Sequence, residues 1–399
     1  MLYNQAEAII QKIENELVQY IDKTFDLSYH GALSGIYGSY LFLFQYYKYM
    51  NDDQCVDMIN EKFENHLNES LNNMSTYTYT NGLAGILYML KFMQDNDLIS
   101  ININAYKSVF DKILTKEMLT DISIENIDFL HGALGVAICL LKIGTTSKTV
   151  NFFIDALFSK AMIDTNNGTC KWKFPFGLNN GAPTYNISLS HGMSGLLIFL
   201  CRIKINGYES SKIDFMIKSG VNYLVEQLFY SSKFVSQFPR LSKEVSFEES
   251  RLAWCYGDLG VSYAIFLSGK TMRDDTLQNL GIKLLTQTTE RLTYTQTAVI
   301  DASICHGSAG LYMFYNRLYL ETKLPVFYHS AQYWIEKTIQ YSTFCDGIAG
   351  YKSFVQNKWI CDYDLLTGVS GIGMSLLSFL QHDTQAWDEI FLLSYCRSW

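Results

Sequence analysis

The sequence predicts an all-α fold, an (α/α)7 toroid in which seven helical hairpins close into a ring. A short Gly-x-x-Gly phrase recurs seven times along the 399 residues, and each copy leads into an apolar stretch with helical spacing. The first glycines of the copies are Gly35, Gly82, Gly132, Gly192, Gly257, Gly307 and Gly368. Even spacing and only four prolines, with no visible linker, favour a single domain over residues 1–399.

Each repeat is expected to pair an outer amphipathic helix with an inner apolar one. Ahead of the first copy, one apolar stripe is formed by Ile10, Ile13, Leu17, Val18 and Ile21. After the second glycine of a copy, as in residues 196–200 and 372–380, the chain is apolar almost all round, which is typical of buried helices. Seven such hairpins can bury their inner helices by closing into a ring.

Glycine suits the start of each inner helix because it admits unusual backbone angles and lets neighbouring helix ends approach closely. All seven phrases occupy the same step of the repeat, so the seven inner-helix starts should share one rim. Helix N-termini there expose N–H groups and partial positive charge, which favour anions such as a thiolate or an enolate. An eighth match, Asp346–Gly350, leads into a polar run and is discounted.

Composition excludes several classes of protein. A net charge of −8 argues against nucleic-acid binding, which needs clustered cations to replace the counterions of phosphate. The N-terminus shows no secretory signal, and the apolar runs are far short of the roughly 18 residues that span a bilayer. Nine cysteines without regular short spacing are unlike a disulfide framework, and most, such as Cys139 and Cys201, lie in apolar runs. We expect a soluble cytoplasmic protein.

A metal site is predicted from two cysteines and one histidine. Cys255 and Cys305 stand two residues ahead of the first glycine in adjacent repeats, so they should face each other at the rim. His306 adds an imidazole nitrogen, and this donor set suits zinc with a fourth position left open, as in catalytic zinc sites. Two packed cysteines and a capping histidine are the alternative; equivalent placement in two repeats favours zinc.

Four other polar residues near this rim could carry chemistry. His191 precedes the glycine of the fourth repeat, where it can act as a general acid or base or merely cap a helix. Asp128 can orient such a base or serve as a helix-start aspartate. Arg251 can steady an enolate or pair with Asp128. His131 holds the equivalent position in the third repeat.

Other features are less specific. Four histidines fall outside this frame and are interpreted as surface or capping groups: His30, His66, His329 and His382. Aromatic residues reach 15%, enough to line a peptide groove, although helical cores also use them. The longer gaps, from Gly132 to Gly192 and from Gly192 to Gly257, could hold an inserted substrate-binding element or ordinary loop extensions.

Three segments together resemble the lanthipeptide cyclase family, the LanC proteins. They are Tyr185–Gly195 (YNISLSHGMSG), Arg251–Gly260 (RLAWCYGDLG) and Ile304–Gly310 (ICHGSAG). The resemblance covers essentially the whole chain and, with no dehydratase region ahead of it, is to the stand-alone type. It implies a seven-hairpin toroid with one zinc ion held by Cys255, Cys305 and His306. It also implies catalytic or supporting roles for His191, Asp128 and Arg251, and none for His131.

The reaction implied by this resemblance is that of a zinc-dependent lanthionine synthetase of lantibiotic biosynthesis. A cysteine thiol of a dehydrated precursor peptide adds, in Michael fashion, to a dehydroalanine or dehydrobutyrine of the same peptide and closes a (methyl)lanthionine thioether ring. Zinc takes the proton off the thiol. Addition of the sulfur to the dehydro residue then leaves an enolate that must gain a proton, and His191 is the candidate donor. Implied partners are a dehydratase and an exporter, through which a cytoplasmic enzyme could be peripheral at the membrane.

Two other readings remain open. A helical-toroid glycosidase needs two carboxylates across a cleft, and Asp128 has no obvious acidic partner in the same frame. A non-cyclising LanC-like protein would bind zinc and a thiol such as glutathione, or a protein partner, without turnover. Failure to cyclise a dehydrated peptide would favour this second reading.

Overall fold

The computed structural model describes residues 2–24, 26, 29–175, 184–230, 233–382 and 387–394, and within the helix at 104–123 it leaves the side chains of 104–106 and 108 undescribed. The chain divides into two compact units. One consists of Met1–Lys107 and Ile300–Ile390, and the other of Ser108–Val299 and Phe391–Trp399. Helices dominate both, so the predicted all-α class is confirmed.

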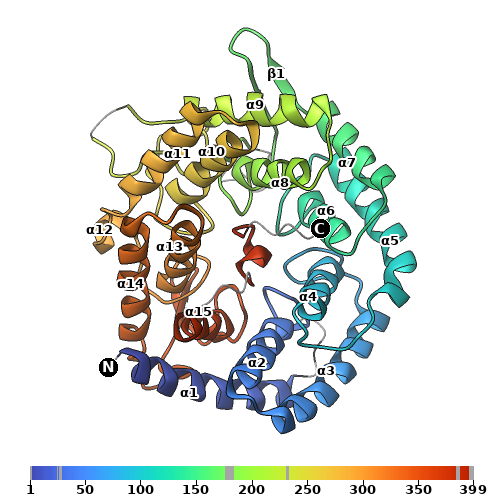
Figure 1. Ribbon diagram of the computed structural model, residues 1–399, viewed down its shortest axis with the longest axis vertical. Coiled ribbons are helices and arrows are strands. Elements are labelled where there is room, and N and C mark those ends of the chain that lie inside the picture. Colours follow the sequence, from blue (N-terminus) through green and yellow to red (C-terminus); the bar gives the residue numbers. More distant parts are fainter. Residues whose placement is uncertain are drawn as a thin grey trace. The chain divides into compact units, whose positions relative to one another are not determined.

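The first unit is built from helices at the two ends of the sequence. These are α1 (Leu2–Lys23), α2 (Ile36–Met50), α3 (Asp53–Asn73), α4 (Leu83–Asp95), α13 (Ser308–Thr322), α14 (Pro325–Gln340) and α15 (Val369–Gln381). They are followed by a 3₁₀ helix, η2 (Trp387–Phe391), whose last residue falls in the second unit. Within this unit α1 packs against α15 and α2, and α14 packs against α13 (Figure 1). Helices far apart in the sequence therefore share one core.

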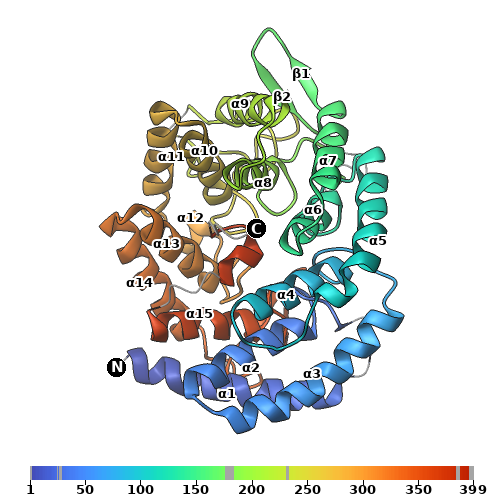
Figure 2. The same ribbon diagram turned by 45° about the vertical axis from the view of Figure 1, so that its right-hand side comes forward.

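The second unit holds the middle of the chain. Its helices are α5 (Asn104–Ser123), α6 (Ala133–Lys142), α7 (Ser147–Ser159), α8 (Met193–Ile205), α9 (Ser211–Glu226), α10 (Asp258–Met272), α11 (Asp275–Thr288) and the single turn α12 (Tyr294–Thr297). Within it α8 lies against both α9 and α10, and α10 packs most extensively against α11 (Figure 2).

The predicted frame of inner helices is confirmed at every copy of the repeat. The first glycine of each phrase is the N-cap residue of α2, α4, α6, α8, α10, α13 or α15. Every described residue of α6, and all of α15 from Val369 to Leu380, is buried. By contrast α1 buries one stripe that includes Ile10, Ile13, Leu17 and Ile21, as expected for an outer helix.

Close approach explains most of these glycines better than unusual backbone angles do. A Cβ on Gly310 would lie 1.9 Å from the carbonyl oxygen of Ile304, six residues earlier, and the second glycine of several other copies meets the same obstacle. At Gly257 both reasons apply, because its φ is 97° and a Cβ would lie 2.1 Å from Arg251 O. The discounted eighth match, at 346–350, forms turns and begins no helix.

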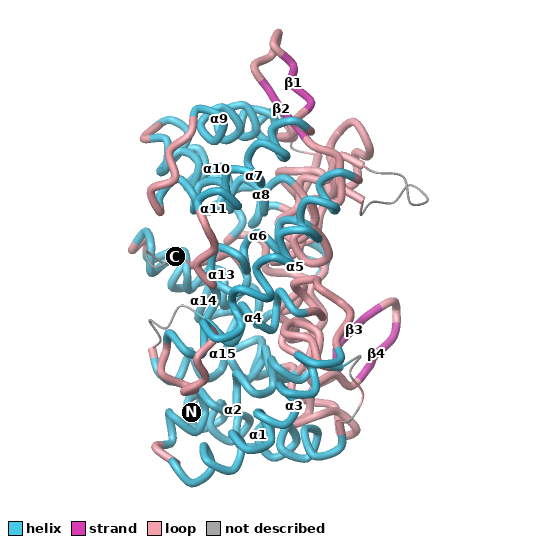
Figure 3. The backbone as a smooth tube through the Cα atoms, turned by 90° about the vertical axis from the view of Figure 1, so that its right-hand side faces the viewer, coloured by secondary structure: helices cyan, strands magenta, loops and turns pink. Residues whose placement is uncertain are grey.

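Two short antiparallel hairpins interrupt the helical pattern, and neither was predicted. β1 (Met162–Asp164) pairs with β2 (Thr169–Lys171), and β3 (Ser353–Val355) pairs with β4 (Lys358–Ile360). Figure 3 shows each as a projection from the helices of its own unit. The first lies in the long gap between Gly132 and Gly192, and the second lies between α14 and α15.

Candidate active site

The loops that precede the inner helices are joined by main-chain hydrogen bonds at one repeated position, two residues ahead of the first glycine. In the first unit Cys305 N donates to Leu366 O, Leu366 N to Leu33 O and Leu33 N to Thr80 O. In the second unit Ser190 N donates to Cys255 O. Within each unit these bonds hold the inner-helix starts side by side, as the shared rim predicts.

The predicted zinc residues stand two residues, or in the case of His306 one residue, ahead of the first glycine, and they belong to different units. Cys255, in the second unit, is buried with 6% of its surface exposed. Cys305 and His306, in the first unit, are half-buried. Across the described residues, no three His, Cys, Asp or Glu side chains are gathered closely enough to hold a metal ion. Zinc binding therefore stays a prediction.

The ring of His306 is held from one side by a buried carboxylate and a strand. Its Nε2 lies 3.2 Å from the carbonyl oxygen of Phe354 on β3 and 3.4 Å from Oδ2 of Asp301. The same Asp301 oxygen accepts a 2.8 Å hydrogen bond from Phe354 N. Burial acts to raise the pKa of Asp301. This effect is outweighed by the hydrogen bond and charge of His306 and by the hydrogen bonds from Phe354 N and Ser303 N, so the pKa of Asp301 is lowered.

His191 and Asp128 form a hydrogen-bonded pair in the second unit. His191 Nδ1 lies 2.7 Å from Asp128 Oδ2, and Asp128 is fully buried while the His191 side chain is 19% exposed. Burial acts against the imidazolium, but the hydrogen bond and charge of Asp128 outweigh it and raise the pKa of His191. A paired carboxylate of this kind fixes the ring orientation and favours its protonated form.

Asp128 also binds main-chain N–H groups ahead of α6. Its other oxygen, Oδ1, accepts hydrogen bonds from Leu130 N at 2.8 Å and His131 N at 2.7 Å. Asp128 therefore holds the turn ahead of α6 without capping the helix, whose N-cap is Gly132, and its orienting of a catalytic base stays a prediction. The ring of His131 stacks on that of His191 with centroids 6.1 Å apart.

Arg251 does not pair with Asp128, so that alternative is wrong. Among the described residues the acceptor oxygens of Asp128 meet His191 and main-chain N–H groups, and Arg251 lies on the surface. Instead, Arg251 lines an open cavity of about 350 Å³ whose other walls are Arg240, Glu249, Cys255, Tyr256 and Ala298. A cavity of this volume beside a thiol can admit a peptide side chain and its backbone.

Tyr256, which sequence reasoning left without a role, joins this cavity to the histidine pair. Its ring lies 5.9 Å from that of His191, and its hydroxyl accepts a 3.2 Å hydrogen bond from Asn186 Nδ2. Burial raises the pKa of Tyr256, so the phenol stays protonated at neutral pH. The guanidinium carbon of Arg240 lies 5.9 Å from the same ring.

The outer wall of the cavity belongs to the long segment between α9 and α10. Asp258, in the first turn of α10, accepts hydrogen bonds from Gln237 N at 2.9 Å and Phe238 N at 3.0 Å. It also forms a buried ion pair of 2.6 Å with Arg291. These contacts fix the segment that carries Arg240 against the helix that follows Cys255, so the long gap holds an ordered element.

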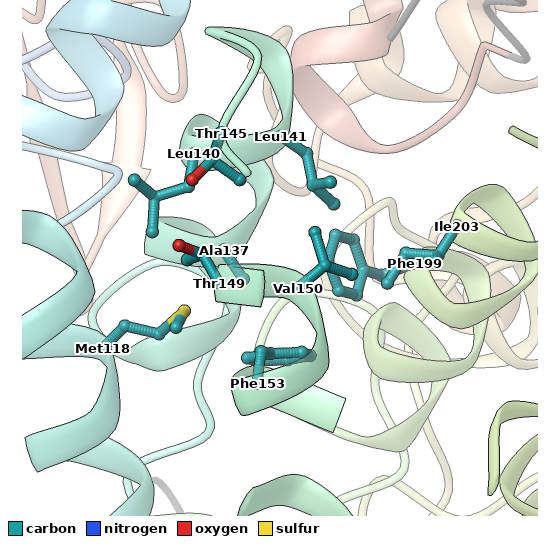
Figure 4. A pocket seen from close by; sticks show the side chains of 10 residues that line it. All are labelled: Met118, Ala137, Leu140, Leu141, Thr145, Thr149, Val150, Phe153, Phe199 and Ile203. Atoms are coloured by element: carbon teal, nitrogen blue, oxygen red, sulfur yellow. The ribbon is translucent and has the colours of Figure 1, made fainter. Parts of the chain in front are cut away.

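Another cavity in the second unit is too small for a ligand. Apolar side chains from α5, α6, α7 and α8, among them Met118, Ala137, Phe153 and Phe199, enclose about 10 Å³ (Figure 4). That volume admits one water molecule at most, and the lining offers it few polar partners. This space is a packing gap in the core.

Two of the four other histidines are not the surface or capping groups that we expected. His30 is fully buried, and its Nδ1 lies 2.7 Å from Ser70 Oγ. His66 is half-buried and bridges Tyr40 Oη and the carbonyl oxygen of Thr24. His329 is exposed and His382 is the C-cap residue of α15, so the interpretation is correct for these two.

Two of the residues that sequence reasoning missed, Asn186 and Asp301, follow a second periodic position. An Asn or Asp stands six residues ahead of the first glycine in four copies: Asn126, Asn186, Asp301 and Asp362. In each, the main-chain carbonyl accepts the N–H that follows the glycine. Reading the repeat further upstream would have revealed Asn186 and Asp301 beside the candidate catalytic residues.

No helix in the described part of the chain is both long enough and apolar enough to cross a bilayer. A curated relative, nisin biosynthesis protein NisC of Lactococcus lactis subsp. lactis, is 23% identical over 291 residues, which is 63% of this chain and 65% of that protein. The matched region thus spans slightly less than two thirds of that relative. A solved structure of nisin cyclase covers 96% of this chain and 97% of its own, with 18% identity and a TM-score of 0.73.

The structural likeness shows a shared fold and confirms the predicted class, an α/α toroid. The family described as lanthionine synthetase C-like protein matches residues 4–392, nearly the whole chain. All three segments that carried the resemblance lie inside this match. The chain therefore belongs to the lanthionine synthetase C-like family.

Proposed function

We propose that this protein is a zinc-dependent lanthipeptide cyclase that adds peptide cysteine thiols to dehydroalanine or dehydrobutyrine and so forms (methyl)lanthionine rings. The observation that carries the proposal is the 2.7 Å pair of His191 and Asp128, close enough to Cys255 for the thiol to affect the pKa of the imidazole. Family membership supplies the reaction class, and this pair supplies a proton donor for it.

His191 is the proposed donor to the enolate of the peptide. Asp128 binds Nδ1, so Nε2 is the nitrogen that exchanges a proton with the substrate. The raised pKa favours the imidazolium near neutral pH, which suits a general acid. Arg251, on the wall of the adjoining cavity, can bind the carbonyl oxygen on which negative charge develops.

The donor chemistry of Cys255, Cys305 and His306 fits zinc. Two thiols and one imidazole form a sulfur- and nitrogen-rich set, and ligating histidines commonly use their other nitrogen to bind a carboxylate or carbonyl. His306 has this arrangement, since Nε2 meets Asp301 and Phe354 O, and in a zinc site Nδ1 would be the coordinating nitrogen. When bound, zinc would keep the substrate thiol deprotonated at neutral pH.

The substrate and partners follow from the same proposal. A dehydrated precursor peptide would occupy the cavity beside Cys255 and Arg251. A dehydratase that supplies this peptide and an exporter that removes the product are the proposed partners, with the protein in the cytoplasm or at the membrane through their complex.

The proposal is tested by measuring bound zinc and thioether formation in the wild type and in Cys305→Ala. We expect near-stoichiometric zinc and ring closure in the wild type, and loss of both in the variant. Cys201→Ala is a matched control, because Cys201 is a buried thiol outside the proposed site. Zinc binding without ring closure in the wild type would favour a thiol-binding protein instead. Full cyclisation by a metal-free Cys305→Ala would refute the mechanism.

A further inference from the structure

The segment between α14 and α15 carries two thiols that have no part in the proposed reaction. Of the eight cysteines that the structure describes, Cys345 and Cys361 are the two exposed ones. They flank the β3–β4 hairpin, with Cys345 ahead of β3 and Cys361 directly after β4. Their positions are therefore the two ends of one small folded loop.

The two cysteines lie close together. The Sγ atom of Cys361 is 3.5 Å from the carbonyl oxygen of Asp346, the residue that follows Cys345. Lys352 Nζ lies 2.5 Å from Asp346 Oδ2. The hydrogen bond with Asp346 raises the pKa of Lys352, and both thiols are near enough to add to this effect. The sulfur of Cys361 therefore lies against the main chain directly beside Cys345.

The backbone already brings the ends of the loop together. The register of the hairpin pairs Ser353 with Ile360, so Lys352 and Cys361 approach each other from opposite strands. Ahead of the hairpin the chain folds back on itself, with Phe344 N donating to Gly350 O at 2.9 Å, and this fold brings the main chain of Cys345 towards Lys352. A disulfide needs Cα atoms roughly 4.4–6.8 Å apart. The sulfur of Cys361 already lies against the main chain beside Cys345, so the proposed disulfide requires rotation of both side chains and a loop movement that brings the Cα atoms into this range.

This hairpin also supports a residue of the candidate active site. Phe354, in the middle of β3, donates its N–H to Asp301 and accepts from His306 through its carbonyl oxygen. A covalent bond between Cys345 and Cys361 would close the loop that contains Phe354. The covalent state of the two cysteines can therefore control how firmly His306 is held.

We propose that Cys345 and Cys361 are a redox-active pair that a small-molecule disulfide, such as glutathione disulfide, converts into an intramolecular disulfide. One protein thiolate attacks glutathione disulfide, forms a mixed disulfide and releases one glutathione. The second protein thiolate then attacks the mixed disulfide and releases the other glutathione. Two protein thiols are oxidised, one glutathione disulfide is reduced, and the two thiol protons end on the two glutathione molecules.

The test is peptide mapping of the full chain by mass spectrometry, without reduction, after incubation with glutathione disulfide and alkylation of the remaining thiols. We expect a cross-linked peptide that joins Cys345 to Cys361 and loss of both from the alkylated set. In Cys361→Ser, Cys345 should carry a glutathione adduct instead. Hydrogen exchange of the amides at 353–355 and 358–360 should slow in the oxidised wild type, and dithiothreitol should restore it.

The control is Cys55→Ser, which removes a half-buried thiol elsewhere in the same unit and should behave as the wild type. Separate glutathione adducts on Cys345 and Cys361, unmodified thiols at both, or a cross-link from either to another cysteine would each overturn the proposal. The readouts are thiol chemistry and amide exchange, so the outcome is independent of whether the protein cyclises a peptide.

Discussion

At the scale of single residues, Asp128 shows how one carboxylate can serve both the fold and the chemistry. Oδ1 accepts the N–H groups of Leu130 and His131 at the turn before α6, and Oδ2 binds His191. The aspartate is held in place by the backbone, so the imidazole bound to it is held as well. This explains how an aspartate in the turn ahead of α6 can also orient the imidazole of His191 in the next repeat.

Asp128→Asn is predicted to separate these two roles. The amide oxygen can still accept from the backbone, but the negative charge that raises the pKa of His191 is lost. We expect the pKa of His191 to fall, as measured by NMR titration, and cyclisation to slow by about 10²-fold, the lower end of the range for general acid–base catalysis.

Asp164→Asn is the matched control for this variant, because Asp164 also accepts a main-chain N–H but is exposed on β1. It should leave both the titration and the rate unchanged. A normal rate in Asp128→Asn with a lowered His191 pKa would mean that another group donates the proton.

A second prediction concerns the buried histidines of the first unit. Burial and their mutual repulsion lower the pKa of His30, and burial lowers that of His66. The negative charges of Glu69 and Asp26 act to raise the pKa of His30. Those of Glu69 and Asp22 act to raise the pKa of His66, and the positive charge of Lys62 acts to lower it. Below about pH 6.5 the unfolded chain therefore binds more protons at these histidines than the folded chain does. The free energy of unfolding falls as pH drops from that value towards the pKa values of the folded state.

Urea unfolding at about pH 7.5 and 5.5 measures this effect, which is at most about 1.4 kcal/mol per pH unit for a fully buried group. We expect His30→Gln to be less stable than the wild type at the higher pH. Its free energy of unfolding should, however, fall by less than that of the wild type between the higher and the lower pH. His329→Gln, at an exposed position, should keep the wild-type pH slope. Equal slopes in His30→Gln and the wild type would contradict the prediction.

At the scale of elements, the glycines set how closely each loop folds onto the helix that it starts. Gly310 lies in the first turn of α13, directly after the loop with Cys305 and His306. Its missing Cβ leaves room for the carbonyl oxygen of Ile304. The close turn that results places both candidate ligands at the helix start.

Gly310→Ala is predicted to destabilise the fold by about 2–3 kcal/mol, because the backbone must shift to relieve the contact. Chemical denaturation gives the free energy of unfolding. Gly168→Asn is the control, since the nearest atom to a Cβ on Gly168 is 4.0 Å away and its φ of 65° lies in the left-handed region that asparagine adopts most readily. A cost at Gly310 no greater than at Gly168 would show that the loop adapts freely.

Sequence periodicity predicted the elements well and their polar contacts poorly. Apolar spacing and the glycine frame located every inner helix, because burial and close approach leave a strong signal in the order of residues. Phe354 was beyond this reasoning, since a strand formed far downstream brings its carbonyl oxygen to His306. His30 was misread for the same reason: its partner Ser70 lies 40 residues away on the neighbouring outer helix.

At the scale of the whole molecule, the proposed zinc residues come from both compact units of the chain. Cys255 belongs to the second unit, and Cys305 and His306 belong to the first. A metal bound only by the folded chain stabilises it by about 2.7 kcal/mol at a free concentration one hundred times its Kd. The proposal therefore connects metal occupancy with global stability.

Zinc added to chelator-treated protein is predicted to raise the unfolding temperature, as followed by circular dichroism or calorimetry. Cys255→Ala should abolish the rise, because it removes one of three protein ligands, whereas Cys201→Ala should retain it. An equal rise in Cys255→Ala and the wild type would place the metal elsewhere.

The main-chain bonds found two residues ahead of the first glycine in most copies have a consequence for how such proteins diverge. The donors at this position include Leu33, Ser190, Cys305 and Leu366, whose side chains range from apolar to reactive, because the bond uses the amide alone. The bond itself excludes only proline, which lacks the N–H, although burial of Leu33 and Ser190 also limits the size and charge of the side chain. Reactive groups can thus be gained or lost by neutral drift at these sites while the scaffold persists, so ancestry alone does not guarantee activity.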